Sequence, residues 1–153
     1  MSDFQASVVL PRPRQEVFEY LRRPANLLKM FPAEKTSRLW LKHPDIISVG
    51  ECIEFKVKAM GAQFVFVHEV TELADAERIV IKQIEGPFKA WSQEQHFADS
   101  GNGNTLLTSV VQFDPPGGML GFVVTRKVVM SQLENWVSKG HQILQQHLAN
   151  PTG

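Results

Sequence analysis

The order of the predicted elements constrains the fold of this chain more than any single motif. Segments in which apolar and polar residues alternate fill most of the sequence, and one long helical pattern, from about residue 119 to 148, closes it. A strongly curved antiparallel sheet followed by a single long helix packs economically when the helix lies in the concave face. Sheet and helix can then separate along part of their length and leave a cavity. The order therefore predicts a small protein that holds an apolar or amphipathic molecule.

The alternating segments predict seven strands, which the hydrophobic period of two places at residues 4–10, 36–42, 51–60, 63–71, 79–85, 91–97 and 105–113. Gly61-Ala62 is expected to form a two-residue hairpin turn, which would pair Phe55 with His68 and Val57 with Phe66. Because cross-strand partners point to the same side of a sheet, Phe66 and His68 should face inward with Phe55.

Proline residues delimit two short helices directly after the first strand. A helix over residues 14–21 is expected between Pro13 and Pro24, and a second over residues 25–31 before Pro32. The long helix has one apolar stripe at i, i+3, i+4 spacing, formed by Leu133, Trp136, Val137, Gly140, His141, Leu144 and Leu148. We expect residues 1–153 to form a single α+β domain, since no linker, repeat or low-complexity tract divides them.

Composition excludes several classes of protein. Sixteen basic and sixteen acidic side chains cancel, so no basic excess indicates a nucleic-acid partner. Cys52 is the only cysteine, which excludes an internal disulfide and a multi-cysteine metal site; we interpret it as a passive thiol. The first five residues lack a signal-peptide pattern, and no apolar run approaches the ~20 residues that span a bilayer. We therefore expect a cytoplasmic protein without an integral membrane segment.

The element order resembles the START-related lipid-transfer superfamily, whose helix-grip fold is shared with birch-pollen-allergen-like and polyketide cyclase/dehydrase-like proteins. The most specific likeness is the segment Gly86-Pro87-Phe88-Lys89-Ala90-Trp91 with the polar alternation after it, which is similar to a bacterial subgroup of ligand-binding members. Gln93 and Gln95 stand where that subgroup typically has histidines, and Ser109 where relatives often carry an acidic residue. The resemblance implies a sheet wrapped around the final helix, and these departures weaken an inherited acid–base or metal role.

Polar side chains on the predicted concave face are the best candidates for recognition of a ligand. Burying an unpaired amide costs roughly 1–3 kcal/mol, so these groups must bond to one another, to water or to a ligand. There are two alternatives to a ligand-binding role. The polar groups could bond to one another within the core, or this region of the sheet could extend past the helix into solvent. Aromatic side chains would form the apolar wall. The predicted ligand-binding residues are Phe55, Phe66, His68, Gln83, Trp91, Gln93, Gln95, Ser109, Trp136 and His141.

The chemistry of these residues favours binding over catalysis. We assign no catalytic residue, no metal ligand and no cofactor, because no inward carboxylate accompanies His68 or His141 and no metal-binding histidine spacing occurs. The predicted function is carriage of a small hydrophobic or amphipathic ligand with an uncharged headgroup, since amides suit neutral groups. A cyclase or dehydratase with His68 or His141 as general acid–base is the alternative, and an interaction domain with a filled core is a third class.

Overall fold

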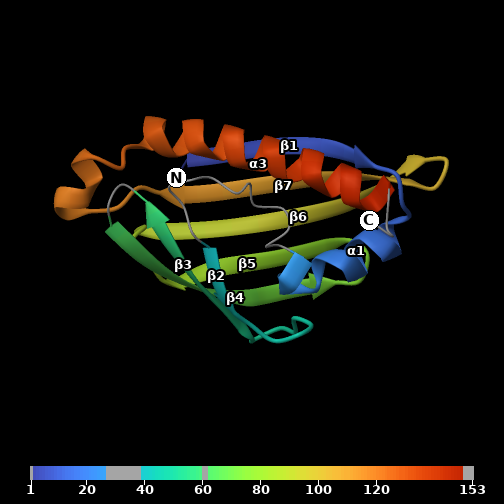
Figure 1. Cartoon of the computed structure of the whole chain (residues 1–153), viewed down its shortest axis with the longest axis horizontal. Helices are drawn as coiled ribbons and strands as arrows, with labels where there is room; N and C mark the ends of the chain where they lie inside the picture. The colour runs from blue at the N-terminus through green and yellow to red at the C-terminus, as the bar shows by residue number, and fades with distance from the viewer. Residues whose placement is uncertain (1, 27–38, 60–61, 150–153) are drawn as a thin grey trace.

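The structure, a computed structural model, describes residues 2–26, 39–59 and 62–149. Within these residues seven strands form one antiparallel sheet in the order β1-β7-β6-β5-β4-β3-β2 (Figure 1). The strands are β1 (Ser2–Leu10), β2 (Leu39–Lys42), β3 (Cys52–Ala59), β4 (Ala62–Ala74), β5 (Arg78–Glu85), β6 (Ala90–Gly101) and β7 (Asn104–Asp114). The main helical elements of the described residues are α1 (Arg14–Leu21), η1 (Gly118–Phe122) and α3 (Arg126–Ala149). The predicted α+β class and helix-grip arrangement are confirmed.

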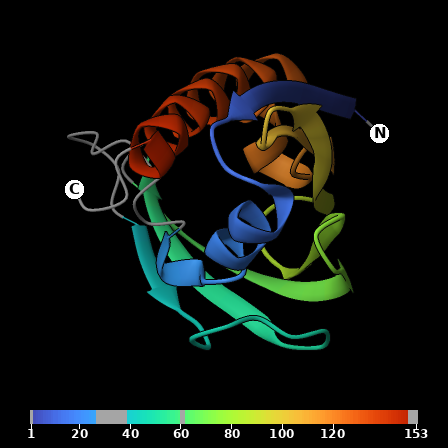
Figure 2. The same cartoon turned by 90° about the vertical axis from the view of Figure 1, so that its right-hand side faces the viewer.

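The sheet curves strongly, and its concave side holds the core. Figure 2 shows the sheet winding from β1 round to β2, with α3 lying across the concave side and α1 at one end. On β7 the side chains alternate strictly between buried and half-buried from Asn104 to Asp114, as a strand with one covered face requires. Leu107, Ser109, Val111 and Phe113 face inward, as the sequence predicts, and so does Thr105.

The β3–β4 hairpin differs from the prediction by two residues in register. Ala59 pairs with Ala62, and Phe55 therefore lies opposite Phe66, while His68 lies opposite Ile53. Strand β4 begins at Ala62, which the prediction placed in the turn, so the ladder gains a pair and the register changes by two residues. A shift of two residues keeps every side chain on its predicted face, since the side-chain period of a strand is two.

The long helix begins at Arg126, so the predicted start at residue 119 is wrong. The backbone N–H of Val128 donates to Thr125 Oγ1 at 3.4 Å, which makes Thr125 the N-cap. The preceding segment instead folds into the 3₁₀ helix η1, close against the turn after β7. A Cβ on Gly121 would lie 2.5 Å from Pro116 O, so this approach depends on glycine. The stripe from Leu133 to Leu148 is helical as predicted.

Of the two predicted short helices, the first is present in full and the second is described only in part. Helix α1 has the predicted bounds and buries Val17, Phe18 and Leu21. Of the second, residues 24–26 are helical, and residues 27–31 lie outside the described part of the chain. The predicted strand at 36–42 is present from residue 39, and its first three positions also lie outside the described residues.

Candidate functional site

The end of the concave face near α1 is filled by a continuous core. Phe18 of α1 packs edge-on against Phe97 of β6, with ring centroids 5.5 Å apart and planes at 78°. Leu10, Leu107 and Leu144 bring β1, β7 and α3 into the same cluster, and all three side chains are fully buried. Apolar groups that pack against one another in this way make a structural core rather than a binding site.

Farther along the concave face, three polar side chains bond to one another and tie α3 to the sheet. Ser109 Oγ donates to Gln95 Oε1 at 2.6 Å and lies 3.0 Å from His141 Nε2. Since the hydroxyl hydrogen goes to Gln95, His141 Nε2 must carry the hydrogen that it donates to Ser109. Burial lowers the pKa of His141, which favours this neutral ring. We call Gln95, Ser109 and His141 the Ser109 network.

A second polar group crosses three neighbouring strands. His68 of β4 lies opposite Gln83 of β5, and the pairing of Lys82 with Ser92 brings Trp91 of β6 beside Gln83. The Gln83 amide donates through Nε2 to Phe88 O at 2.8 Å. Within the described part of the chain, three buried atoms in this group have no hydrogen-bond partner: His68 Nε2, Gln83 Oε1 and Trp91 Nε1. We call His68, Gln83 and Trp91 the His68 row.

The environment of the His68 ring is apolar. The side chain is 4 % exposed, and burial lowers its pKa to about 4. The cause is desolvation, which penalises the imidazolium form. The ring meets Phe55 edge-on, with centroids 4.8 Å apart, and Phe66 in the same manner at 6.0 Å. At neutral pH His68 is therefore an uncharged imidazole within an aromatic surrounding.

Aromatic rings continue from the His68 row toward the start of α3. Phe55 and Phe66 stack with centroids 4.9 Å apart and planes at 7°. Phe88, in the loop between β5 and β6, contacts Phe66 at 6.4 Å, Trp91 at 4.9 Å and Phe113 at 6.0 Å. Sequence analysis missed Phe88 as a site residue because it lies in a loop without periodicity. Its position between the strands that carry Gln83 and Trp91 was the available signal.

The remaining predicted site residues, Gln93 and Trp136, belong to neither the Ser109 network nor the His68 row. Gln93 lies opposite Ile81 on β5 and Val111 on β7. Trp136 is half-buried on α3. Gln83 and Gln95 have different partners, since Gln83 bonds to Phe88 O and Gln95 bonds to Ser109.

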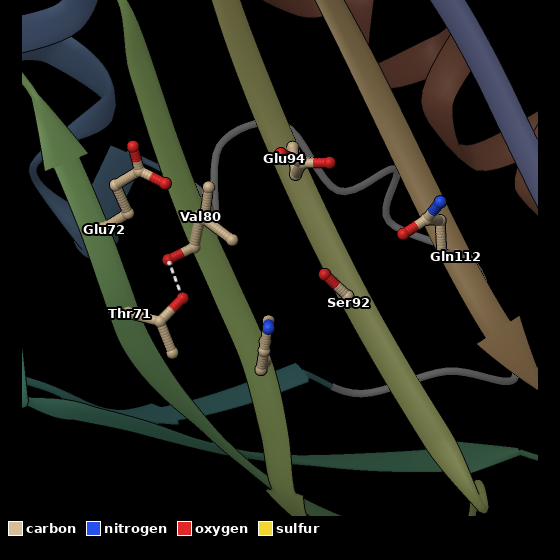
Figure 3. Close-up of a pocket in the computed structure, with 7 residues that line it drawn as sticks. Thr71, Glu72, Val80, Ser92, Glu94 and Gln112 are labelled. Atoms are coloured by element: carbon tan, nitrogen blue, oxygen red, sulfur yellow. Dashed lines mark hydrogen bonds between the residues drawn. The ribbon is translucent and has the colours of Figure 1, made fainter.

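A hollow of about 340 Å³ lies on the opposite, outer face of the sheet (Figure 3). Thr71 Oγ1 donates to Val80 O at 3.4 Å across it. Its lining is mostly polar and consists of Thr71, Glu72, Val80, Lys82, Ser92, Glu94 and Gln112. These side chains lie on the outer face of β4 to β7, whereas the His68 row lies on the concave face. The hollow is therefore separate from the His68 row, and we interpret it as a shallow depression of the surface.

Two observations bear on metal ions and membranes. Among residues 2–26, 39–59 and 62–149, no three histidine, cysteine, aspartate or glutamate side chains gather as a metal ligand set. In the same part of the chain, no helix is both long and apolar enough to span a bilayer.

Comparison with known proteins identifies the family. The family described as "Polyketide cyclase / dehydrase and lipid transport" matches residues 1–148. The chain belongs to this family. This family is part of the START-related superfamily with the helix-grip fold that the sequence resembles. A search of the curated proteins gave no match.

Several solved structures have the same fold. The Zhui aromatase/cyclase from a Streptomyces species is 14 % identical, with a TM-score of 0.81 over 99 % of this chain and 96 % of that one. A protein from Thermus thermophilus is 17 % identical, with a TM-score of 0.79 over 99 % of this chain and 100 % of that one. The major latex-like protein 151 from Panax ginseng is 14 % identical, with a TM-score of 0.70 over 96 % and 97 %. At these identities the likeness establishes the fold alone.

Proposed function

We propose that this protein binds a small, neutral, amphipathic molecule non-covalently between the sheet and α3, with the polar group of the molecule at the His68 row. The observation that carries the proposal is the set of three buried polar atoms without partners on adjacent strands. Each such atom costs roughly 1–3 kcal/mol when it stays unpaired. A ligand that bonds to these atoms recovers that free energy, so the row favours an occupant.

The donors and acceptors of the row define the polar group. Trp91 Nε1 only donates, Gln83 Oε1 only accepts, and neutral His68 does either according to its tautomer. A hydroxyl both donates and accepts, so it matches Trp91 and Gln83 together. A carboxylate or phosphate would favour arginine or lysine, and the row contains neither. The rings of Phe55, Phe66 and Phe88 suit a flat, apolar body attached to that hydroxyl.

Carriage without chemistry is favoured over a cyclase or dehydratase reaction. The hydroxyl hydrogen of Ser109 points to Gln95 rather than to His141, so this pair is not arranged as a nucleophile and its base. His68, with a pKa of about 4, is a weak base at neutral pH. The family description covers both lipid transport and cyclase or dehydrase activity, so the proposal of carriage depends on these residues.

Native mass spectrometry of freshly purified protein, combined with calorimetric titration, tests the proposal. We expect a co-purifying small molecule of unchanged mass after incubation. In titration, 1-naphthol should bind about tenfold more tightly than naphthalene, which lacks the hydroxyl, and 1-naphthoate should bind more weakly than either. A protein that is always free of ligand and binds none of the three would contradict the proposal and favour an interaction domain with a filled core.

The His68→Ala variant separates the carrier from the enzyme. An enzyme that uses His68 as general acid–base should lose turnover of the co-purifying molecule by about 100-fold or more. A carrier should show no turnover before or after the substitution, and only its affinity should change. Chemical conversion of the ligand by the wild-type protein that His68→Ala abolishes would overturn carriage in favour of catalysis.

A further inference from the structure

The segment between β7 and α3 exposes apolar side chains to an unusual degree. Met119 is 85 % exposed, Phe122 83 % and Val123 59 %, and η1 buries none of its residues. In Figure 1 this segment lies at one end of the molecule, beyond the end of the sheet. We call Met119, Phe122 and Val123 the apolar tip. Among the residues that the structure describes, the other exposed large apolar side chains are Val128, which follows the tip in α3, and five that lie elsewhere, Val9, Ile46, Val49, Val65 and Ile84, at 37–60 %.

Basic side chains border the apolar tip, and the nearest acidic residues along the chain are Asp114 and Glu134. From Pro115 to Leu133 the sequence contains no aspartate or glutamate, while Arg126 and Lys127 are basic and exposed. The Lys89 side chain lies beside the same segment, since a Cβ on Gly117 would be 3.0 Å from Lys89 Cε. A protruding apolar group with a basic border matches the interface of an anionic bilayer, where apolar side chains enter the acyl boundary and cations meet the headgroups.

We propose that the apolar tip docks this protein onto an anionic lipid surface, with Met119, Phe122 and Val123 inserted and Arg126, Lys127 and Lys89 at the headgroups. A second copy of the chain suits the tip less well. Two tips in contact would bring their Arg126 and Lys127 side chains together, and the segment has no acidic residue to offset the repulsion.

The docked end is the aromatic end of the interior. Lys89 follows Phe88, whose ring contacts Trp91 and Phe113. Val124, directly after the apolar tip, packs against the buried cluster that contains Phe113 and Val129. A surface-bound protein therefore presents to the lipid the same end at which the aromatic rings gather. The docking proposal does not depend on an internal ligand, and its test requires none.

Sedimentation with lipid vesicles tests the docking. The full chain should bind vesicles that contain about one third phosphatidylserine, bind phosphatidylcholine vesicles weakly, and dissociate at high salt. The double variant Met119→Ser/Phe122→Ser should lose about tenfold or more in vesicle affinity. Arg126→Glu/Lys127→Glu should lose a similar factor at low salt. Val49→Ser, which removes an apolar side chain elsewhere that is as exposed as Val123 (60 % against 59 %), is the control and should bind like wild type.

Thermal unfolding of each variant accompanies the vesicle assay, since the exposed tip should tolerate serine without loss of the fold. Absence of wild-type binding to the anionic vesicles would overturn the proposal. Equal binding by wild type and Met119→Ser/Phe122→Ser would do the same. A concentration-dependent dimer in sedimentation velocity that this double variant abolishes, without any vesicle binding by wild type, would assign the tip to a second copy instead.

Discussion

The Ser109 network and the His68 row lie on the same concave face, but they differ in whether their buried polar atoms have hydrogen-bond partners. In the network each group has a partner, because Ser109 joins Gln95 of β6 to His141 of α3. In the row His68 Nε2, Gln83 Oε1 and Trp91 Nε1 have no partner in the described part of the chain. The comparison teaches that burial of a polar side chain does not by itself indicate a site. The network fastens the helix to the sheet, whereas the unpartnered atoms of the row support the proposed ligand site.

The largest expected effect is a loss of stability at the end of the concave face near α1, where the packed core has a structural role alone. Leu144→Ala removes a fully buried side chain from the cluster with Leu10 and Leu107. We expect the free energy of unfolding in urea to fall by about 4 kcal/mol, because the substitution leaves a cavity in a close-packed core. Affinity for 1-naphthol should change little in the variant that remains folded. A loss below about 1 kcal/mol would mean that this end is not a packed core.

The pH dependence of stability should come largely from His68. Its folded pKa, about 4, is below the usual 6.5, so the unfolded chain binds the proton more readily. Stability is therefore full above pH 6.5 and falls as the pH decreases toward 4, by about 3 kcal/mol in total. His141, whose pKa is also lowered, contributes with the same sign. Urea unfolding at several pH values should show this decline, and His68→Phe should make it shallower. An unchanged slope in His68→Phe would contradict the buried neutral imidazole.

Ser109→Ala separates the two polar groups directly. The substitution removes the hydroxyl that joins Gln95 to His141 and leaves both without this partner, so unfolding free energy should fall by about 2 kcal/mol. Because Ser109 does not belong to the His68 row, 1-naphthol affinity should stay within about twofold of wild type. Calorimetric titration alongside urea unfolding measures both. A variant that keeps its stability and loses the ligand would reverse the assignment of network and row.

Gly86→Ala is a milder test of the row. A Cβ at Gly86 would overlap the Gln83 amide oxygen, which is the flexible end of a side chain and can move aside. The displaced amide no longer donates to Phe88 O, so 1-naphthol affinity should fall by about threefold to tenfold. Gly50→Ala is the matched control, because that glycine also has a positive φ (+91°, against +159° at Gly86) and so carries backbone strain too, while a Cβ there would meet no atom within 4 Å. Equal affinities for both variants would remove Gln83 from the site.

The sequence predicted the fold well because the hydrophobic period of two determines which side of the sheet each residue faces. A change of register by two residues does not alter this facing. Phe55, Phe66 and His68 therefore lie on the predicted face, although their cross-strand partners differ from the predicted ones. The helix start was wrong because apolar residues continue through η1, where the close approach of Gly121 to Pro116 O ends the regular pattern. The hydrophobic periodicity of a segment carries no information about such a contact.

The sequence predicted which face of the sheet the candidate site residues occupy, but it did not predict which of them bond to one another. Gln83, Gln93 and Gln95 share the concave face, but their positions along β5 and β6 decide which partner each one reaches. Gln83 reaches a loop carbonyl at Phe88, and Gln95 reaches Ser109 two strands from β5. These contacts depend on register and on loop conformation, neither of which a single sequence specifies.

The central claim, that the His68 row recognises a hydroxyl group, is tested most directly by Trp91→Phe. This substitution keeps an aromatic ring against Phe88 and Phe113 and removes the only N–H donor of the Trp91 side chain. Calorimetric titrations with 1-naphthol and naphthalene measure the preference for the hydroxylated ligand, and Gln112→Met on the outer face is the control. We expect the preference to fall by about fivefold in Trp91→Phe and to persist in the control. An undiminished preference in Trp91→Phe would contradict the account.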